Sequence, residues 1–336
     1  MREKQLAVCD RDDQYLDMLQ AYLLKKKPAG FEILVFGSVC QAVAASQEEC
    51  FEILLIGEHT YNTDAEEIHA LKTFILQEDG LSGIKGIPFL SKYQSMEALI
   101  RQALDAFALD EACASAVRCG KNRTRLVCFY SPSRHSAQTL ASLCAGELLT
   151  DWGKKVLYLN LSAFSGFEEL LGIQYNADIT DFMYFVLKHS DKLLYKLEGM
   201  KHTIHGMDYL PPALDYMDLM ELDEKDWQNV LDTLLYSGDY THIVIDLTEV
   251  CQGFYHILER SDKIYLVNGK TAAREQAMLH QFQNLLLAKE HGEIIEKATI
   301  LALQGNWEAQ GAALDQLSVS ELGAYMKGIL QEYEYE

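Results

Sequence analysis

The sequence predicts an α/β protein built from two doubly wound parallel sheets. Along the chain, short apolar runs of strand length alternate with segments of helical periodicity, which is the pattern of parallel α/β domains. Several runs are apolar at every residue, as strands covered on both faces are, and FEILLI (Phe51 to Ile56) is the clearest. The chain has 336 residues. That length is enough for two domains of about 150 residues each.

Composition excludes several classes of protein. With 49% hydrophobic and 24% charged residues, the chain is an ordinary globular one. Its net charge of −21 repels the phosphates of nucleic acids, so we expect no nucleic-acid partner. No apolar run approaches the roughly 18 residues of a membrane span, and acids near the start argue against a signal peptide. Eight scattered cysteines without a CxxC pair favour reduced thiols, a cytoplasmic location and no metal site.

The first domain is predicted over residues 1–110. We expect its five strands at Gln5–Cys9, Phe31–Phe36, Phe51–Ile56, Thr73–Gln77 and Ile87–Leu90. Apolar residues at helical spacing predict helices around Tyr15–Leu23, Cys40–Ala45, Ala65–Leu71 and Met96–Phe107. Strands and helices in alternation predict a parallel sheet with helices on both faces.

A linker is predicted over residues 111–124, where Gly120 and Asn122 interrupt regular structure, and the second domain over 125–336. We expect strands at Leu126–Tyr130, Lys155–Leu161, Ile204–Leu210, His242–Ile245, Lys263–Val267 and Ala298–Gln304. Helices are predicted at Leu140–Leu149, Ile179–Leu187, Asp226–Leu235, Gly253–Arg260, Thr271–His291 and Ser320–Glu332. Residues 188–200 are expected to form an exposed helix or a loop.

The stretch from Arg125 to Thr139 has the layout of a phosphate-binding loop: a strand, a tight turn and a helix that opens with Thr. A working loop needs glycines, so that backbone N–H groups can approach phosphates, and a Lys that reaches the β- and γ-phosphates. Here Ala137 and Gln138 stand where that Gly-Lys pair would precede Thr139. The degenerate nucleotide site comprises Ser131, Pro132, Ser136, Ala137, Gln138, Thr139 and the strand-end Asp246.

Losing the Lys has a calculable cost. A charge-assisted contact to phosphate contributes about 1.5–3 kcal/mol, so Gln138 should lower affinity by roughly one to two decades. Hydrolysis should suffer further, because positive charge on the developing phosphoryl group is most of the catalysis. We therefore expect no catalytic residue and no ATPase activity. Weak binding of ATP and Mg²⁺ stays open, with Thr139 and Asp246 as the candidate metal ligands and Arg134 as a substitute cation.

The first domain resembles response-regulator receiver domains. The resemblance rests on Asp10, Asp12 and Asp13 after the first strand, on the third strand FEILLI, and on FLSKYQSMEALI with Lys92. It implies that the acids hold Mg²⁺, that an Asp after the third strand is phosphorylated, and that the Lys contacts the phosphate.

In this sequence Gly57 occupies the phosphoacceptor position, and Glu58 is one residue out of register. Neighbouring side chains at a strand end point to opposite faces, so Glu58 is a poor substitute. We interpret the domain as a pseudo-receiver whose site corresponds to Asp10, Asp12, Gly57 and Lys92. Because there is no acceptor Asp, we prefer the alternative interpretation, in which the acids complement a helix dipole and the lysine is solvated or locally hydrogen-bonded.

The second domain resembles the MinD/ParA group of deviant Walker ATPases, and the two-domain order resembles the TadZ/CpaE proteins. The segments that carry this are YSPSRHSAQT, KVLYLNLSAFSGFEELL, GMDYLPPALDYMDL, THIVIDL and RSDKIYLV. The resemblance implies a homodimer that localises and assembles the Tad (Flp) type IV pilus or secretion machinery. Its partners would be assembly proteins at the cytoplasmic membrane face or a cell pole. A nucleotide-gated dimerisation switch, a slow ATPase and an atypical response regulator using Glu58 are the alternatives.

Overall fold

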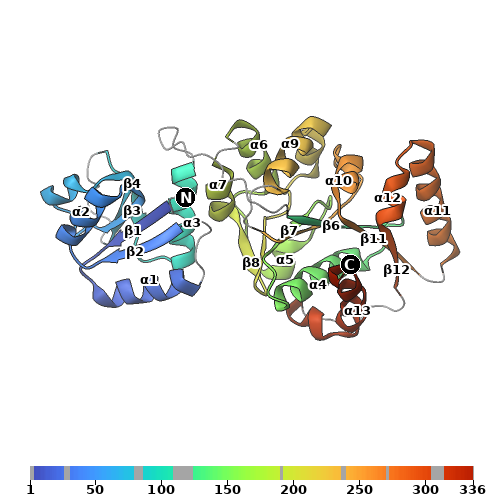
Figure 1. The fold of residues 1–336 in the computed structure, drawn as a ribbon, viewed down its shortest axis with the longest axis horizontal. Helices are drawn as coiled ribbons and strands as arrows, with labels where there is room; N and C mark the ends of the chain where they lie inside the picture. Colours follow the sequence, from blue (N-terminus) through green and yellow to red (C-terminus); the bar gives the residue numbers. More distant parts are fainter. Residues whose placement is uncertain are drawn as a thin grey trace. The chain divides into compact units, whose positions relative to one another are not determined.

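A computed structural model describes residues 4–25, 31–78, 86–108, 124–189, 192–235, 240–269, 272–303 and 314–335. The chain forms two compact units (Figure 1). The first contains Met1–Val117 and Asp191–Met200, and the second contains Arg118–Ser190 and Lys201–Glu336. Each unit is an α/β domain around one sheet, as the sequence predicts. The predicted linker 111–124 lies outside the described residues except for Thr124, whose hydroxyl donates to the carbonyl of Tyr240 in the second unit.

The first sheet is parallel throughout, with the strand order β2-β1-β3-β4-β5 of a doubly wound fold. Its strands are β1 (Lys4–Cys9), β2 (Phe31–Phe36), β3 (Phe51–Gly57), β4 (Ala70–Gln77) and β5 (Phe89–Ser91). Its helices are α1 (Asp13–Lys25), α2 (Val39–Glu48) and α3 (Met96–Ala108). The helix expected near Ala65 is a 3-10 turn, η1 (Thr63–Glu67), because β4 begins earlier than predicted and pairs Ala70 with Phe51.

Helix α7 (Leu193–Met200) also belongs to the first unit, although the sequence places it in the second domain as an exposed segment. Its Tyr195 ring packs on Phe31 and Phe107, with ring centroids 5.6 and 4.8 Å apart. Lys196 Nζ lies 2.6 Å from Asp105 Oδ1 on α3. The expectation of an exposed segment is therefore wrong, because the apolar side of this helix is covered by α3 and β2.

The second sheet has the order β12-β11-β6-β10-β7-β9-β8. Its strands are β6 (Arg125–Tyr130), β7 (Val156–Asn160), β8 (His202–Ile204), β9 (Met207–Tyr209), β10 (His242–Asp246), β11 (Lys263–Gly269) and β12 (Ala298–Leu303). All pairs are parallel except β8 with β9.

The single strand predicted over Ile204–Leu210 is in fact this antiparallel hairpin, so the second sheet is mixed. His205 and Gly206 both have positive φ, 48° and 78°, which is the conformation of a two-residue hairpin turn.

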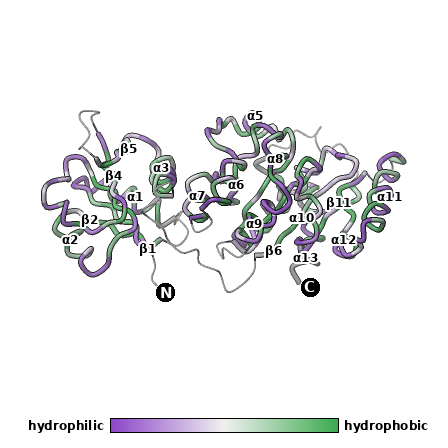
Figure 2. Tube along the Cα trace, turned by 90° about the horizontal axis from the view of Figure 1, so that it is seen from above, coloured by the Kyte–Doolittle hydropathy of each residue, from purple (hydrophilic) through white to green (hydrophobic). Residues whose placement is uncertain are grey.

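Helices cover both faces of the second sheet. They are α4 (Ala137–Asp151), α5 (Phe167–Leu171), α6 (Ile179–Lys188), α8 (Tyr216–Glu221), α9 (Glu224–Leu235), α10 (Phe254–Arg260), α11 (Ala273–Ala288), α12 (Gly292–Lys297) and α13 (Glu321–Tyr335). One face carries α4 and α13, and the other carries α6, α9 and α10 (Figure 1). Hydrophobic residues run through the strands (Figure 2). Because α13 and the 3-10 turn η5 (Leu314–Val319) cover the outer side of α4, that helix is buried along most of its length.

We expect Tyr195→Ala to lower the free energy of unfolding of the first unit by about 3 kcal/mol, because it removes a buried aromatic ring and leaves a cavity. Urea unfolding followed by circular dichroism measures the change. Tyr93→Ala is the matched control, since Tyr93 is 74% exposed in the same unit and should change stability by less than about 0.5 kcal/mol. Equal effects of the two changes would contradict the docking of α7 on α3.

Candidate functional site

Three strand ends meet at one edge of the second sheet. Asp246 ends β10 and pairs in register with Asn160, which ends β7, and with Phe129 near the end of β6. The loop 131–136 leads from β6 into α4, and a hollow of about 290 Å³ opens beside it. Ligands of doubly wound folds bind at the carboxyl ends of the strands, so this edge is the candidate site.

The predicted nucleotide-site residues come together there. Ser131, Ser136, Gln138 and Thr139 line the hollow together with Arg134 and His135. Pro132, in the turn, and Ala137, the first residue of α4, are buried. Asp246 is fully buried next to the start of α4.

Asp246 is the centre of a closed hydrogen-bond cluster. One carboxylate oxygen accepts from Gln138 Nε2 at 2.5 Å, and the other accepts from Thr139 Oγ1 at 2.6 Å. The second oxygen also accepts from Asn160 Nδ2 at 3.1 Å and from the Tyr158 hydroxyl at 3.4 Å. All four donors are uncharged. Burial raises the pKa of Asp246, and the hydrogen bonds from Thr139, Gln138 and Tyr158 oppose that rise.

Gln138 turns its side chain inward. Besides Asp246, its Nε2 reaches the carbonyl oxygens of Leu247 at 2.9 Å and Phe129 at 3.4 Å. The amide therefore joins the ends of β6 and β10, and only 7% of the residue is exposed. Gln138, at the position where a working phosphate-binding loop has lysine, therefore bonds to the protein itself.

The loop also satisfies its own backbone N–H groups. The N–H of His135 donates to Ser131 Oγ at 2.9 Å, and the N–H of Arg134 donates to the carbonyl of Ser131 at 3.0 Å. The His135 ring accepts from the N–H of Ala137 at 3.2 Å, and the His135 carbonyl accepts from the N–H of Gln138 at 3.0 Å. A phosphate cradle needs such groups to be directed at the ligand, and here four of them are engaged within the loop.

An acid lines the hollow next to the substitute cation. Arg134 has a positive φ of 54°, and its Nη2 atom lies 3.6 Å from Oε2 of Glu249. The Tyr130 hydroxyl donates to Glu249 Oε1 at 3.1 Å, and burial together with the charge of Glu249 raises the pKa of Tyr130. Glu249 offsets the charge of Arg134 and disfavours a triphosphate in the hollow.

These residues do not fit Mg²⁺–ATP held in the manner of a phosphate-binding loop. The Thr139 hydroxyl is bonded to Asp246, four backbone N–H groups of the loop and helix start are engaged, and an amide replaces the ammonium. Binding in that manner would break several of these contacts at once.

Sequence reasoning overlooked two members of this site, Tyr158 and Glu249. A signal was present in KVLYLNL: Tyr158 and Asn160 lie two residues apart in a buried strand, so they share one face and need polar partners.

The first unit has a polar cluster at the corresponding edge. Lys92 Nζ lies 2.9 Å from Asp10 Oδ2 and 2.8 Å from Glu78 Oε1, and Lys92 and Asp10 are both buried. Burial lowers the pKa of Lys92, but its hydrogen bonds to Glu78 and Asp10 outweigh that and raise it. Of the two expectations for Lys92, a solvated side chain is wrong because the residue is buried, whereas local hydrogen bonding is confirmed by its contacts with Glu78 and Asp10. Asp12 caps the start of α1 by accepting from the N–H of Tyr15 at 3.1 Å, as the alternative interpretation expects.

Gly57 lies against this cluster. A Cβ atom added to it would lie 2.5 Å from Asp10 Oδ2, so the Asp10 carboxylate takes the space where an acceptor side chain would begin. Glu58 is directed to β4, where its Oε2 accepts from the N–H of Glu78 at 3.2 Å.

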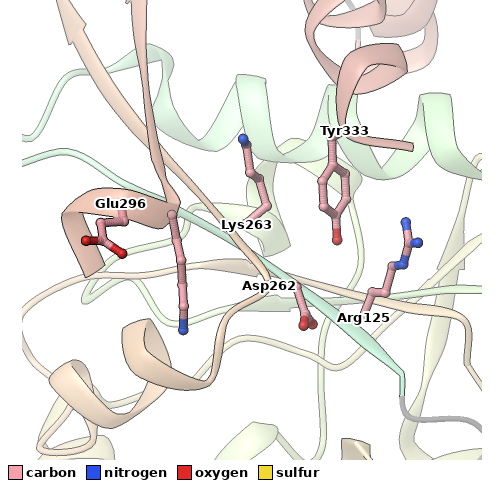
Figure 3. A pocket seen from close by; sticks show the side chains of 6 residues that line it. Arg125, Asp262, Lys263, Glu296 and Tyr333 are labelled. Carbon is pink, nitrogen blue, oxygen red and sulfur yellow. The ribbon is translucent and has the colours of Figure 1, made fainter. Parts of the chain in front are cut away.

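A second hollow of the second unit, about 370 Å³, lies at the opposite edge of the sheet (Figure 3). It is lined by Arg125, Asp262, Lys263, Glu296, Lys297 and Tyr333. Asp262 accepts from the N–H of Leu126 at 2.7 Å, and the Arg125 guanidinium lies 5.4 Å from the centre of the Tyr333 ring. Charges of both signs are interspersed there, and these contacts tie the strand starts to α13.

Two features are absent among the described residues. No helix among them is both long and apolar enough to cross a bilayer. No three His, Cys, Asp or Glu side chains of that part of the chain are grouped so as to hold a metal ion.

No protein-family model and no curated protein matches the sequence. Among solved structures, a ParA family ATPase of Chlorobium tepidum TLS is similar, with a TM-score of 0.45 and 16% identity over 58% of this chain and 80% of that one. The MinC:MinD cell division complex of Aquifex aeolicus has a TM-score of 0.42 and 18% identity, over 58% and 77%. A plasmid partition protein of Borrelia burgdorferi has a TM-score of 0.43 and 16% identity, over 63% and 99%. We take the function from the residues of the site.

We expect acetyl phosphate with Mg²⁺ to leave the first unit unmodified, because Gly57 offers no carboxylate and Asp10 is paired with Lys92. Intact-mass spectrometry checks this, with a receiver domain that has an acceptor Asp as the reagent control. A base-labile gain of one phosphoryl group on Glu58 or Asp12 would contradict it.

Proposed function

We propose that this protein is a non-hydrolysing binding module, in which an ATPase-like domain serves as a scaffold for other proteins. The observation that carries this is the inward amide of Gln138, which bonds to Asp246 and to the carbonyl oxygens of Leu247 and Phe129. In a nucleotide-hydrolysing site that position supplies a cation to the phosphates. Here it supplies neutral hydrogen bonds to the protein itself.

The free energies of the hydrogen bonds favour keeping Gln138 and Thr139 bonded to Asp246. Each hydrogen bond is worth about 0.5–1.5 kcal/mol net, and bonds to a charged group about 1.5–3 kcal/mol. Opening the contacts of Gln138 and Thr139 would leave the Asp246 carboxylate buried with fewer donors, which is more costly than losing a bond at the surface. A ligand would have to offset this without the lysine contact.

A nucleotide-gated dimerisation switch is the second candidate. The hollow of about 290 Å³ favours it, since Arg134 and the start of α4 border a space at the carboxyl ends of the strands. In this alternative ATP binds without turnover and controls self-association. A slow ATPase would further require Arg134 to act in place of the lysine, although Glu249 is its neighbour.

A narrower form of the proposal comes from the sequence motifs that resemble TadZ/CpaE proteins. In that form, a homodimer helps to localise and assemble the Tad pilus or secretion machinery at the cytoplasmic membrane face or a cell pole. Fluorescence microscopy of the tagged protein, in cells with and without those assembly proteins, would test this role, and sedimentation of the purified chain would test the homodimer.

We expect the purified protein to show no magnesium-dependent ATPase activity above a blank, because the site lacks the cation on which phosphoryl transfer depends. Phosphate release and calorimetric titration with ATP and Mg²⁺ measure turnover and binding separately. Turnover that Asp246→Ala abolishes would overturn the proposal, whereas binding without turnover would favour the switch.

We expect Ala137→Gly combined with Gln138→Lys to raise ATP affinity at least about tenfold, equivalent to one charge-assisted contact of roughly 1.4 kcal/mol. The double change returns an ammonium and a freely adaptable backbone to the start of α4. Ala137→Gly with Gln138→Met is the matched control, since it opens the same contacts without adding charge. If a folded lysine variant gains no more than this control, the loop is an ordinary strand–helix turn.

A further inference from the structure

An exposed apolar surface borders the hollow of the second unit. Phe164 lines that hollow and is 87% exposed, and its ring meets Tyr216 edge to face with centroids 5.7 Å apart. Tyr216 begins α8, which also exposes Met217 (51%) and Met220 (40%), while Leu214 just before it is 59% exposed. We call Phe164, Leu214, Tyr216, Met217 and Met220 the apolar rim.

The apolar rim is surrounded by carboxylates. Residues 214–226, LDYMDLMELDEKD, contain six acids and one lysine. Helix α8, YMDLME, itself contains two of these acids beside its methionines. Glu221 accepts from the hydroxyl of Tyr184 on α6 at 3.2 Å, which links the end of α8 to α6.

The raised pKa of Asp218 is consistent with other carboxylates lying close to it. Desolvation and the neighbouring charges of Asp215, Glu221, Asp178 and Asp181 all raise its pKa. An excess of carboxylates around exposed methionine and aromatic side chains needs a positive counterpart, and exposed apolar patches of this kind mark interaction sites.

We propose that the apolar rim and its acids bind a basic amphipathic helix of a partner protein, with apolar residues on one side and Lys or Arg on the other. This rests on the binding role proposed above and names the chemistry of the partner. Met217 and Met220 are flexible and adapt to different apolar side chains, and amphipathic helices dock by this mode on apolar grooves. The acids would pair with the basic residues at the edge of the contact and speed association.

The negative charge around the apolar rim disfavours three other binding partners: a second copy of the chain, a nucleic acid and an anionic lipid surface. A second copy related by two-fold symmetry would bring the same acids face to face, and like charges at an interface are costly. Nucleic acids and anionic lipid surfaces carry the same sign as this surface and would be repelled. A segment of opposite charge is the complement.

The test is fluorescence anisotropy of a labelled Lys/Leu amphipathic peptide of about 18 residues, titrated with the full chain in the absence of nucleotide. We expect saturable binding, and at least about tenfold weaker binding of a scrambled peptide of identical composition. Asp218→Lys with Glu221→Lys, and separately Met217→Ser with Met220→Ser, should each weaken binding at least about tenfold.

The matched control is Asp151→Lys with Glu332→Lys, which changes net charge equally at exposed sites of the same unit and should alter affinity by less than about twofold. Equal loss in both charge variants, or equal binding of the scrambled peptide, would reduce the effect to general attraction and overturn the proposal. The proposal would also be overturned if sedimentation showed a dimer of the chain and the changes Met217→Ser and Met220→Ser dissociated it. Because no nucleotide is present, these outcomes are independent of whether the site binds ATP.

Discussion

A buried carboxylate is the constraint on which the second unit depends. Asp246 has no contact with solvent, so its charge has to be stabilised by donors within the protein. The start of α4 provides Gln138 and Thr139, and β7 provides Tyr158 and Asn160. Burial raises the folded-state pKa above the ordinary value of 3.8, so ionising this group removes stability as pH rises from that value through the raised pKa. The same bonds fix the entry of α4 onto the sheet.

Both units have a cluster of polar side chains at the carboxyl ends of their parallel strands. Strand ends bring polar side chains together there, and each cluster is satisfied from within. In the first unit an ammonium, Lys92, pairs with both Asp10 and Glu78, whereas in the second unit neutral amides and hydroxyls surround one acid. The first arrangement is an ion pair and the second is a hydrogen-bond network. In both clusters the donors Lys92, Gln138 and Thr139 are already bonded to a carboxylate, so an incoming phosphate would compete for them.

Most of the fold could be predicted from the sequence, because continuous apolar runs such as FEILLI and THIVIDL identify buried parallel strands. The hairpin of β8 and β9 was not predicted, since its turn depends on a positive φ at His205, and positive φ is uncommon for any residue other than glycine. The sequence places the candidate site at the loop before α4, and the structure brings the residues named for it together there. The inward direction of Gln138 could not be foreseen, because its partners Asp246 and Leu247 are distant in sequence and only the sheet brings them near.

Helix α7 makes the first unit discontinuous in sequence, which affects how the chain is made. A nascent protein completes a domain only when its last element has left the ribosome, and here that element ends at Met200. Strands β6 and β7 of the second unit are therefore synthesised before the first unit can close over Tyr195. A fragment cut at residues 111–124 would leave Phe31 and Phe107 without that ring. Consequently, no single cut of the chain separates the two units with all of their segments intact.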